Sequence, residues 1–174
     1  ASLTSGIDPA KPAAAPLTFL PYLSGERTPH NNAGARGALV GMSQATEVED
    51  LARAALEGVT YAFVDSLDAL KDAGTTTDTV YAIGGGARSD AWVQMIADAC
   101  AMPLHVPADG DFGGAFGAAR LGFVASEGAD PFEALSMAPI QKTIEPNPDN
   151  ADSNAENLER YRARYPGTPG QVSH

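Results

Sequence analysis

Cysteine, basic side chains and long apolar runs are all scarce in this chain of 174 residues. The single cysteine, Cys100, excludes an internal disulfide. There are 11 lysines and arginines against 22 aspartates and glutamates, a net charge of -11, and such a surface repels nucleic acid. No apolar run approaches the roughly 18 residues of a membrane span, and residues 1–16 do not resemble a signal peptide. We therefore expect a cytoplasmic protein with neither nucleic acid nor membrane as a partner.

The composition is otherwise that of a globular protein. Hydrophobic residues make up 44% of the chain, which is enough for one domain with a core of its own. Residues 1–16 are rich in proline and alanine and are typical of a linker or a chain end. Residues 17–145 carry the patterned part of the sequence. Residues 146–174 predict a polar tail with a short helix at 157–165.

Strand and helix patterns alternate between residues 17 and 124, which predicts an α/β domain with helices flanking a sheet. Expected strands lie at residues 17–23, 37–42, 79–83 and 104–106. Expected helices begin after residue 46, near residue 89 and within the glycine-rich stretch at residues 109–122, and they end near residues 71, 102 and 124.

Local signals support these helices. Thr46 and Glu49 have the spacing of a capping box at the start of the first helix, and Gly74 follows its end. Gly58 interrupts this helix, and its small size predicts close packing against another element. Ser89 is a suitable N-cap for the second helix. That helix is expected to place these residues on one face: Trp92, Met95, Ile96 and Ala99.

A run of glycines between a strand and a helix is the most informative local feature. Gly84, Gly85, Gly86 and Ala87 directly follow the strand expected at 79–83. Without a Cβ the backbone can come close to a ligand, and the following helix N-terminus favours phosphate. Neither the P-loop lysine nor the GxGxxG spacing is present. Considered alone, these glycines fit a plain tight turn slightly better than a nucleotide site.

A second glycine cluster precedes the third helix. Gly113, Gly114, Gly117 and Ala118 recur three and four residues apart, which is more typical of close helix packing than of ligand contact. Asp111 is expected to cap this helix rather than to bind a metal ion. The three histidines are scattered, and no cluster has the spacing of metal ligands, so we expect no metal site in this chain.

Four blocks in order along the chain resemble the C-terminal domain of the FGGY carbohydrate kinases. Residues 37–57 fit the second signature pattern of that family. The loop GERTPH at residues 25–30 is similar to the xylulokinases within the family. GGGARSDAW at residues 84–92 resembles the adenosine-binding turn, and GDFGGAFGAARLG at residues 110–122 resembles the helix start that follows it. Together the blocks cover about residues 17–124.

This resemblance implies an actin-like (ribonuclease H-like) fold of two lobes, of which the chain would be the incomplete C-terminal half. It implies phosphoryl transfer from ATP, with Mg²⁺, to D-xylulose, giving D-xylulose 5-phosphate. The matched positions Gly84, Gly85, Gly86 and Ala87 would line the ATP site. Asp90 would lie near the adenine, at a position where the family often has asparagine, and could accept a hydrogen bond from the adenine amine. A side chain introduced by Gly86→Val is expected to block the nucleotide.

The resemblance also implies what this chain lacks. The catalytic base, an aspartate, and the residues that bind the sugar are expected upstream, so we assign no catalytic residue here and expect the chain alone to be inactive. Another FGGY kinase, acting on glycerol or gluconate, is the nearest alternative. A non-catalytic nucleotide-binding or interaction module of the same fold is a second. The oligomeric state stays open, with a homodimer as one option.

Overall fold

The computed structural model describes residues 7, 17–108, 113–128, 130 and 139–165. Among these residues, no helix combines the length and apolar character needed to cross a lipid bilayer. Nearly all of the linker predicted at residues 1–16 and the cap predicted at Asp111 lie outside the described part. The elements, in chain order, are β1 (Thr18–Leu20), β2 (Ala38–Val40), α1 (Val48–Asp72), β3 (Val80–Tyr81), the 3-10 helix η1 (Gly85–Arg88), α2 (Asp90–Cys100), β4 (Leu104–Pro107), α3 (Gly113–Glu127), β5 (Ile140–Ile144), the 3-10 helix η3 (Pro148–Asn150) and α5 (Ala151–Arg164).

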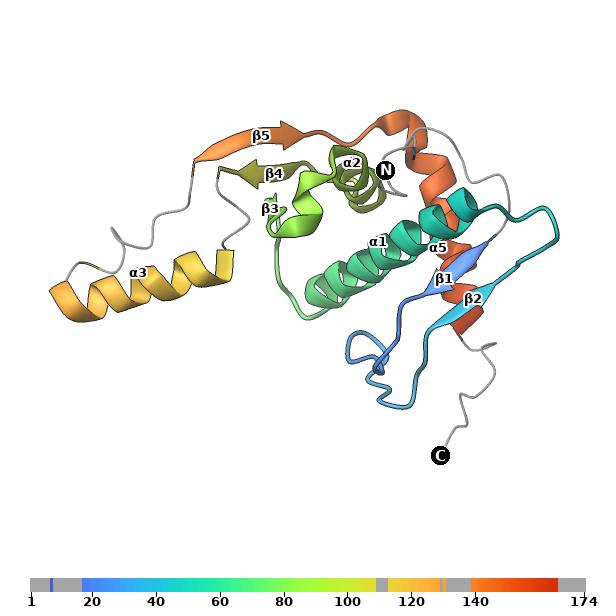
Figure 1. The fold of residues 1–174 in the computed structure, drawn as a ribbon, viewed down its shortest axis with the longest axis horizontal. Helices are drawn as coiled ribbons and strands as arrows, with labels where there is room; N and C mark the ends of the chain where they lie inside the picture. The colour runs from blue at the N-terminus through green and yellow to red at the C-terminus, as the bar shows by residue number, and fades with distance from the viewer. Residues whose placement is uncertain (1–6, 8–16, 109–112, 129, 131–138, 166–174) are drawn as a thin grey trace.

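The long helix α1 runs through the middle of the molecule, and two small sheets lie on either side of it (Figure 1). β1 and β2 form an antiparallel pair. In the second sheet the order is β3-β4-β5, with β3 parallel to β4 and β4 antiparallel to β5. The helix α3 stands apart from the other helices at the end of the molecule (Figure 1). The predicted alternation of strands and helices is therefore confirmed, although the described strands are short.

The strand β5 was missed by the sequence patterns, which predict only an irregular polar segment after Pro139. Its sequence, IQKTI, has three polar residues in a row, so no alternation of apolar and polar residues marks it as a strand. It becomes a strand because it pairs with β4, in a register that places Ile144 opposite Leu104 and Thr143 opposite His105. The Nδ1 of His105 lies 2.7 Å from the Thr143 hydroxyl, so this histidine helps to hold β4 and β5 together.

The start of α1 differs by one residue from the predicted capping box. Glu47, not Thr46, is the N-cap, and its backbone N–H donates to the Asp50 carboxylate at 3.0 Å. The Thr46 hydroxyl is already engaged, because it accepts the backbone N–H of Ser43 at 2.9 Å in the preceding turn. At the other end, Gly74 has φ +88° and follows the last helical turn, as predicted.

The glycine in the middle of α1 lies against β1. A Cβ placed on Gly58 would lie 2.2 Å from the carbonyl oxygen of Phe19, so only glycine allows the helix to approach this strand so closely. The prediction that Gly58 serves close packing is confirmed. This contact sets the distance between α1 and the first sheet.

One hydrophobic cluster joins the two ends of the described chain. The phenol of Tyr161, in α5, is buried and lies 2.9 Å from the phenol of Tyr22, which follows β1. Burial is the main cause that raises the pKa of both phenols, so both stay neutral and able to hydrogen-bond. The buried members of this cluster are Leu20, Tyr22, Ala35, Tyr61 and Tyr161.

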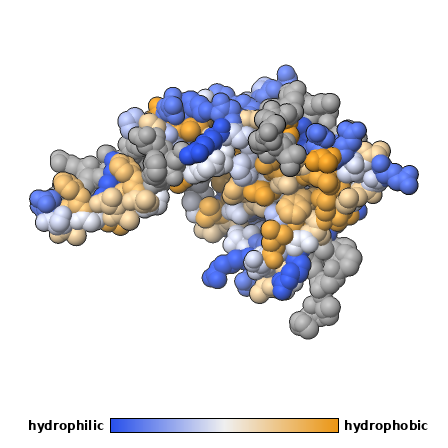
Figure 2. Space-filling model, viewed as in Figure 1, coloured by the Kyte–Doolittle hydropathy of each residue, from blue (hydrophilic) through white to orange (hydrophobic). Residues whose placement is uncertain are grey.

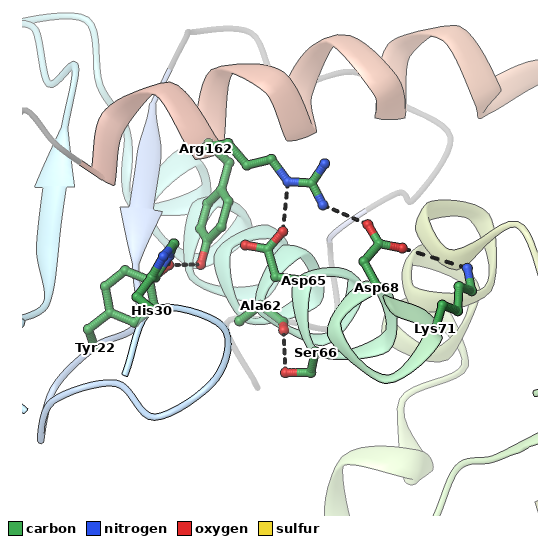
Figure 3. Close-up of polar contacts among 9 residues, drawn as sticks. Tyr22, His30, Ala62, Asp65, Ser66, Asp68, Lys71 and Arg162 are labelled. Carbon is green, nitrogen blue, oxygen red and sulfur yellow. Dashed lines mark hydrogen bonds and ion pairs between the residues drawn. The ribbon is translucent and has the colours of Figure 1, made fainter. Parts of the chain in front are cut away.

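Charged contacts hold α5 against α1 in the same region (Figure 3). The guanidinium of Arg162 donates to the carboxylates of Asp65 and Asp68, both at 2.7 Å. Asp65 is only 5% exposed, so this ion pair is better shielded from water than a surface pair. The helix predicted at residues 157–165 forms the second half of α5, which packs against β1, α1 and α2.

A second cluster forms between α2 and the three-stranded sheet. Its buried members are Val93, Ala97, Leu104 and Val106. The predicted face of α2 is therefore wrong in part, because Val93 and Ala97 face the sheet while Trp92 is turned toward α1. A helix packed on both sides buries more than one stripe, and a single-stripe pattern cannot separate the two.

We predict that Gly58→Ala lowers the free energy of unfolding by about 1–3 kcal/mol, because the new methyl group overlaps the carbonyl of Phe19. Gly117→Ala in α3 is the matched control, since a Cβ there meets nothing within 4 Å. Alanine's helix propensity should make that variant neutral or more stable by up to ~1 kcal/mol. Urea unfolding measures both, and equal behaviour of the two variants would contradict the close contact.

Candidate functional site

The glycine run that follows β3 folds into a tight turn. Gly84 has φ +85° and ψ -176°, a conformation that L side chains rarely adopt, and it turns the chain out of the sheet. The next residues form one turn of 3-10 helix. The N–H of Ala87 donates to the carbonyl of Gly84, and the N–H of Ser89 donates to the carbonyl of Gly86, each at 3.1 Å. The turn therefore has one defined backbone shape.

Ser89 joins this turn to α2. Its hydroxyl accepts the backbone N–H of Trp92 at 3.3 Å, so the predicted N-cap is confirmed. Because the cap follows directly after η1, the first turn of α2 begins at a fixed position beside the glycines. Asp90 is the first residue of the helix.

Two backbone donors in the turn are open. Gly85 and Gly86 are exposed, and no group in the described part of the chain accepts a hydrogen bond from either N–H. A Cβ on Gly85 would meet nothing within 4 Å. Unpaired N–H groups at the start of a helical turn are suited to an anion such as a phosphate. The turn therefore has the free donors and the open space that a phosphate group needs.

Gly86 has a different constraint from Gly85. A Cβ on Gly86 would lie 2.5 Å from the ring of Trp92. That ring is held in place because its Nε1–H donates to the hydroxyl of Thr60, in α1, at 3.1 Å. A side chain at Gly86 would therefore collide with the protein itself, and Gly86→Val would not test nucleotide binding as expected. Gly85 is the position at which a side chain reaches open space.

Asp90, at the start of α2, is paired with a residue of the sheet that the sequence patterns did not single out. Its carboxylate forms an ion pair with the ammonium group of Lys142, in β5. Lys142 lies opposite Val106, whose side chain packs toward α2, and directly opposed residues share one face of a sheet. Lys142 therefore reaches the start of α2. It was missed because β5 was missed, and only the isoleucines that bracket it, Ile140 and Ile144, hinted at a strand.

The structure thus brings the predicted site residues together. Gly84, Gly85, Gly86 and Ala87 form the turn, and Asp90 begins the helix that leaves it. Their shared surface offers two N–H donors, one carboxylate and one ammonium group. In the part of the chain that the structure describes, no group of three histidine, cysteine, aspartate or glutamate residues could hold a metal ion.

Comparison with known proteins agrees with this geometry. Residues 6–126 match the model of the FGGY family of carbohydrate kinases, C-terminal domain. The chain belongs to this family. It is 39% identical over 165 residues to the xylulose kinase of Escherichia coli, an alignment that covers 94% of this chain and 34% of that protein. The gluconokinase of Bacillus subtilis is 36% identical over 143 residues, covering 75% of this chain and 28% of that protein.

Solved structures show the same relationship. The crystal structure of a xyloylose kinase from Brucella ovis has a TM-score of 0.84 and 44% identity, and it is matched over 95% of this chain and 34% of that one. The predicted fold class, an incomplete C-terminal part of an actin-like sugar kinase, is confirmed. The chain spans about a third of the length of the relatives it matches.

The two glycines should respond differently to the same substitution. We predict that Gly86→Ala lowers the free energy of unfolding by about 1–3 kcal/mol and shifts the fluorescence of Trp92, the only tryptophan, because the methyl group displaces its ring. Gly85→Ala should leave the fluorescence unchanged and the free energy within about 0.5 kcal/mol. A large loss at Gly85 would show that the turn is not open there.

Proposed function

We propose that this chain is the nucleotide-binding part of a kinase that transfers a phosphoryl group from ATP to D-xylulose, giving D-xylulose 5-phosphate. The observation that carries the proposal is the open turn at Gly84–Ala87, in a chain that resembles xylulose kinases over nearly its whole length. ATP would supply the phosphoryl group, and Mg²⁺ would reduce the charge of its phosphates.

The residues of the turn fit the phosphate end of a nucleotide. The N–H groups of Gly85 and Gly86 have no acceptor among the described residues, and no side chain covers Gly85. Gly84 and Ala87 hold the shape of the turn through their hydrogen bond. These groups would bind and orient ATP. No cluster of metal ligands accompanies them in the described part, so Mg²⁺ would reach the site with the phosphates.

Asp90 and Lys142 fit the other end of the nucleotide. Adenine presents an amine donor and the N7 acceptor side by side on one edge, whereas guanine presents two acceptors there. A carboxylate beside an ammonium group is complementary to the adenine edge. With guanine, the carboxylate would face the O6 acceptor, and two acceptors repel each other. Asp90 is 70% exposed and Lys142 is 37% exposed, so both can reach a ligand. We assign adenine recognition to this pair.

The acceptor sugar and the catalytic base belong, in this proposal, to the part of the protein outside this chain. Phosphoryl transfer depends on holding the attacking hydroxyl in line with the transferred group. The described residues supply binding groups for the nucleotide alone. The chain by itself would therefore show no turnover.

The activity is tested with a protein extended to the length of its relatives, by measuring ADP release with D-xylulose, D-gluconate and glycerol. We expect turnover to be fastest with D-xylulose. Gly85→Val should raise the KM for ATP about tenfold or more, because its side chain occupies open space at the turn, while the KM for the sugar changes little. Preference for D-gluconate would favour the second candidate, which the similarity to a gluconokinase supports. If none of the three acceptors gives ATP-dependent turnover, the remaining candidate is a nucleotide-binding module without kinase activity.

Base recognition is tested in the same protein with ATP analogues. Removing N7, as in 7-deaza-ATP, should raise the KM about tenfold in the wild type and have no further effect in Lys142→Met. An ATP analogue that lacks the adenine amine should likewise raise the KM in the wild type and have no further effect in Asp90→Ala. Lys71→Met is the matched control, because Lys71 is an exposed lysine of α1 that pairs with Asp68. If 7-deaza-ATP affects Lys142→Met as strongly as the wild type, Lys142 does not contact the base.

A further inference from the structure

A polar pocket lies between α1, α2 and the start of α5. Its volume is about 250 Å³, and none of the described residues that line it belongs to the glycine turn. Apolar side chains reach the surface over α1 and along α3 (Figure 2), whereas most of the side chains that line this pocket are polar or charged. A hollow of this kind needs an occupant that forms hydrogen bonds, either water or a polar ligand.

The charged groups of the pocket are satisfied within the protein. Nε of Arg53 donates to the carboxylate of Glu57 at 2.7 Å, and the side chains of this pair are only 14% and 11% exposed. The carboxylate of Asp98 accepts three hydrogen bonds, each of 2.7 Å, through its two oxygens. Asp149, the remaining carboxylate, is exposed to water. A charged ligand would therefore gain little from these groups.

Neutral hydrogen-bonding groups remain open in the same pocket. The amide oxygen of Asn154 accepts from the Tyr61 hydroxyl at 3.5 Å, but no described residue accepts a hydrogen bond from the amide nitrogen of Asn154. The amide nitrogen of Asn150 donates to Asp98, whereas its amide oxygen has no donor among the described residues. The Ser153 hydroxyl donates to the carbonyl of Asn150 at 3.0 Å and can still accept. Open donors and acceptors thus lie together at the junction of η3 and α5.

Hydroxyl groups match this arrangement, because each hydroxyl can both donate and accept. A polyol or a monosaccharide carries several hydroxyls on a carbon skeleton whose C–H groups are apolar. Met95 and Tyr61 supply apolar surface in the pocket for such a skeleton. Pockets for small molecules have volumes of roughly 300–1,000 Å³, so a pocket of about 250 Å³ suits a molecule of this size better than a nucleotide.

We propose that the polar pocket binds a small, neutral polyhydroxylated molecule, a polyol or a monosaccharide, through Asn150, Ser153 and Asn154. The hydrogen bonds from Asn150 to Asp98 and from Ser153 to the Asn150 carbonyl hold two of these side chains in place before a ligand arrives. Binding then costs little ordering of the protein. The site is separate from the glycine turn and does not depend on the proposed kinase activity.

Other occupants fit the pocket less well. An anion would lie beside the carboxylates of Glu57, Asp98 and Asp149. An organic cation would find only the exposed carboxylate of Asp149 without a partner among the described residues. A metal ion finds no suitable group of ligands in the described part of the chain. An apolar ligand would bury the open amide groups without hydrogen bonds.

Trp92 provides a reporter beside the pocket. Thr60 lines the pocket, and its hydroxyl accepts the indole N–H of Trp92 at 3.1 Å. Thr60 is only 2% exposed, so this hydrogen bond is shielded from water. A ligand in the pocket changes the surroundings of Thr60, and the magnetic resonance signal of the indole N–H therefore reports on binding.

The first experiment titrates D-sorbitol into the isotope-labelled protein, extended to the length of its relatives. We expect saturable shifts of the side-chain amide signals of Asn150 and Asn154 and of the Trp92 indole N–H. The Kd should be about 1–10 mM, because a small ligand makes few contacts. The backbone amide of Gly85, outside the pocket, is the internal control and should not shift. Absence of a saturable shift at the pocket, or tighter binding of spermidine or citrate there, would overturn the proposal.

The second experiment removes the open amide. Asn154→Leu should raise the Kd for D-sorbitol about tenfold or more, because leucine offers no hydrogen bond and fills part of the pocket. Leucine is a good helix former, so α5 should persist. Glu156→Leu is the matched control, since Glu156 is an exposed residue of α5 outside the pocket, and it should leave the Kd within about twofold. Equal Kd values for the two variants would contradict the proposed contacts.

A milder variant covers the case in which Asn154→Leu does not fold. Ser153→Ala removes one hydroxyl from an exposed position and should raise the Kd for D-sorbitol about threefold or more. An unchanged Kd in this variant would count against the site.

The same signals identify the other outcomes. If D-sorbitol shifts signals elsewhere but not those of Asn150 and Asn154, it binds at another site and the proposal fails. If these side-chain amides are already protected from solvent exchange in the longer protein, a segment of that protein fills the pocket, and the proposal fails as well. ADP release is measured separately, so either result leaves the proposed function standing.

Discussion

The contact between Trp92 and Thr60 connects the candidate site to the rest of the molecule. The indole N–H of Trp92 donates to the hydroxyl of Thr60 at 3.1 Å, and Thr60 is almost completely buried in α1. The indole ring in turn leaves no room for a side chain at Gly86. The position of the turn therefore follows from the packing of α2 on α1. A nucleotide site at this turn would be rigid because of the buried hydrogen bond between Trp92 and Thr60, and not because of the loop itself.

The helix α1 also sets the positions of β1 and α5. It carries Gly58, which lets the helix approach β1. About two turns further on, the same face carries Asp65, which pairs with Arg162 of α5. The segment that begins the described chain and the segment that ends it thus meet on the same helix. The Tyr22–Tyr161 hydrogen bond closes this arrangement with buried, uncharged partners. Polar residues of α5 are part of the domain for this reason, although their composition resembles that of a tail.

The described residues also combine a well-packed half with an open half. The clusters around Tyr161 and Val93 are closed. In contrast, an open groove lined by residues of α1, β3 and α2 and the surface of α3 keep large apolar side chains in contact with water. β3 is the outermost strand of its sheet and is parallel to β4, and parallel sheets are usually covered on both faces. The open turn and the open groove lie side by side, because Gly86 and Ala87 belong to both.

The sequence alone determined the features that depend on local chemistry. The helical period of α1, the left-handed glycines at its end and in the turn, and the cap at Ser89 all follow from the preferences of nearby residues. The glycine turn and Asp90 could be located for the same reason, together with the family resemblance of their sequence. These features need no distant partner to form.

Only the tertiary structure decided the features that depend on residues far apart in the chain. β5 is a strand because β4 lies beside it, and Lys142 reaches Asp90 only in that pairing. The separate roles of Gly85 and Gly86 depend on where the Trp92 ring lies, which α1 decides. In each case several local arrangements are equally favourable along the sequence, and a non-local contact selects one.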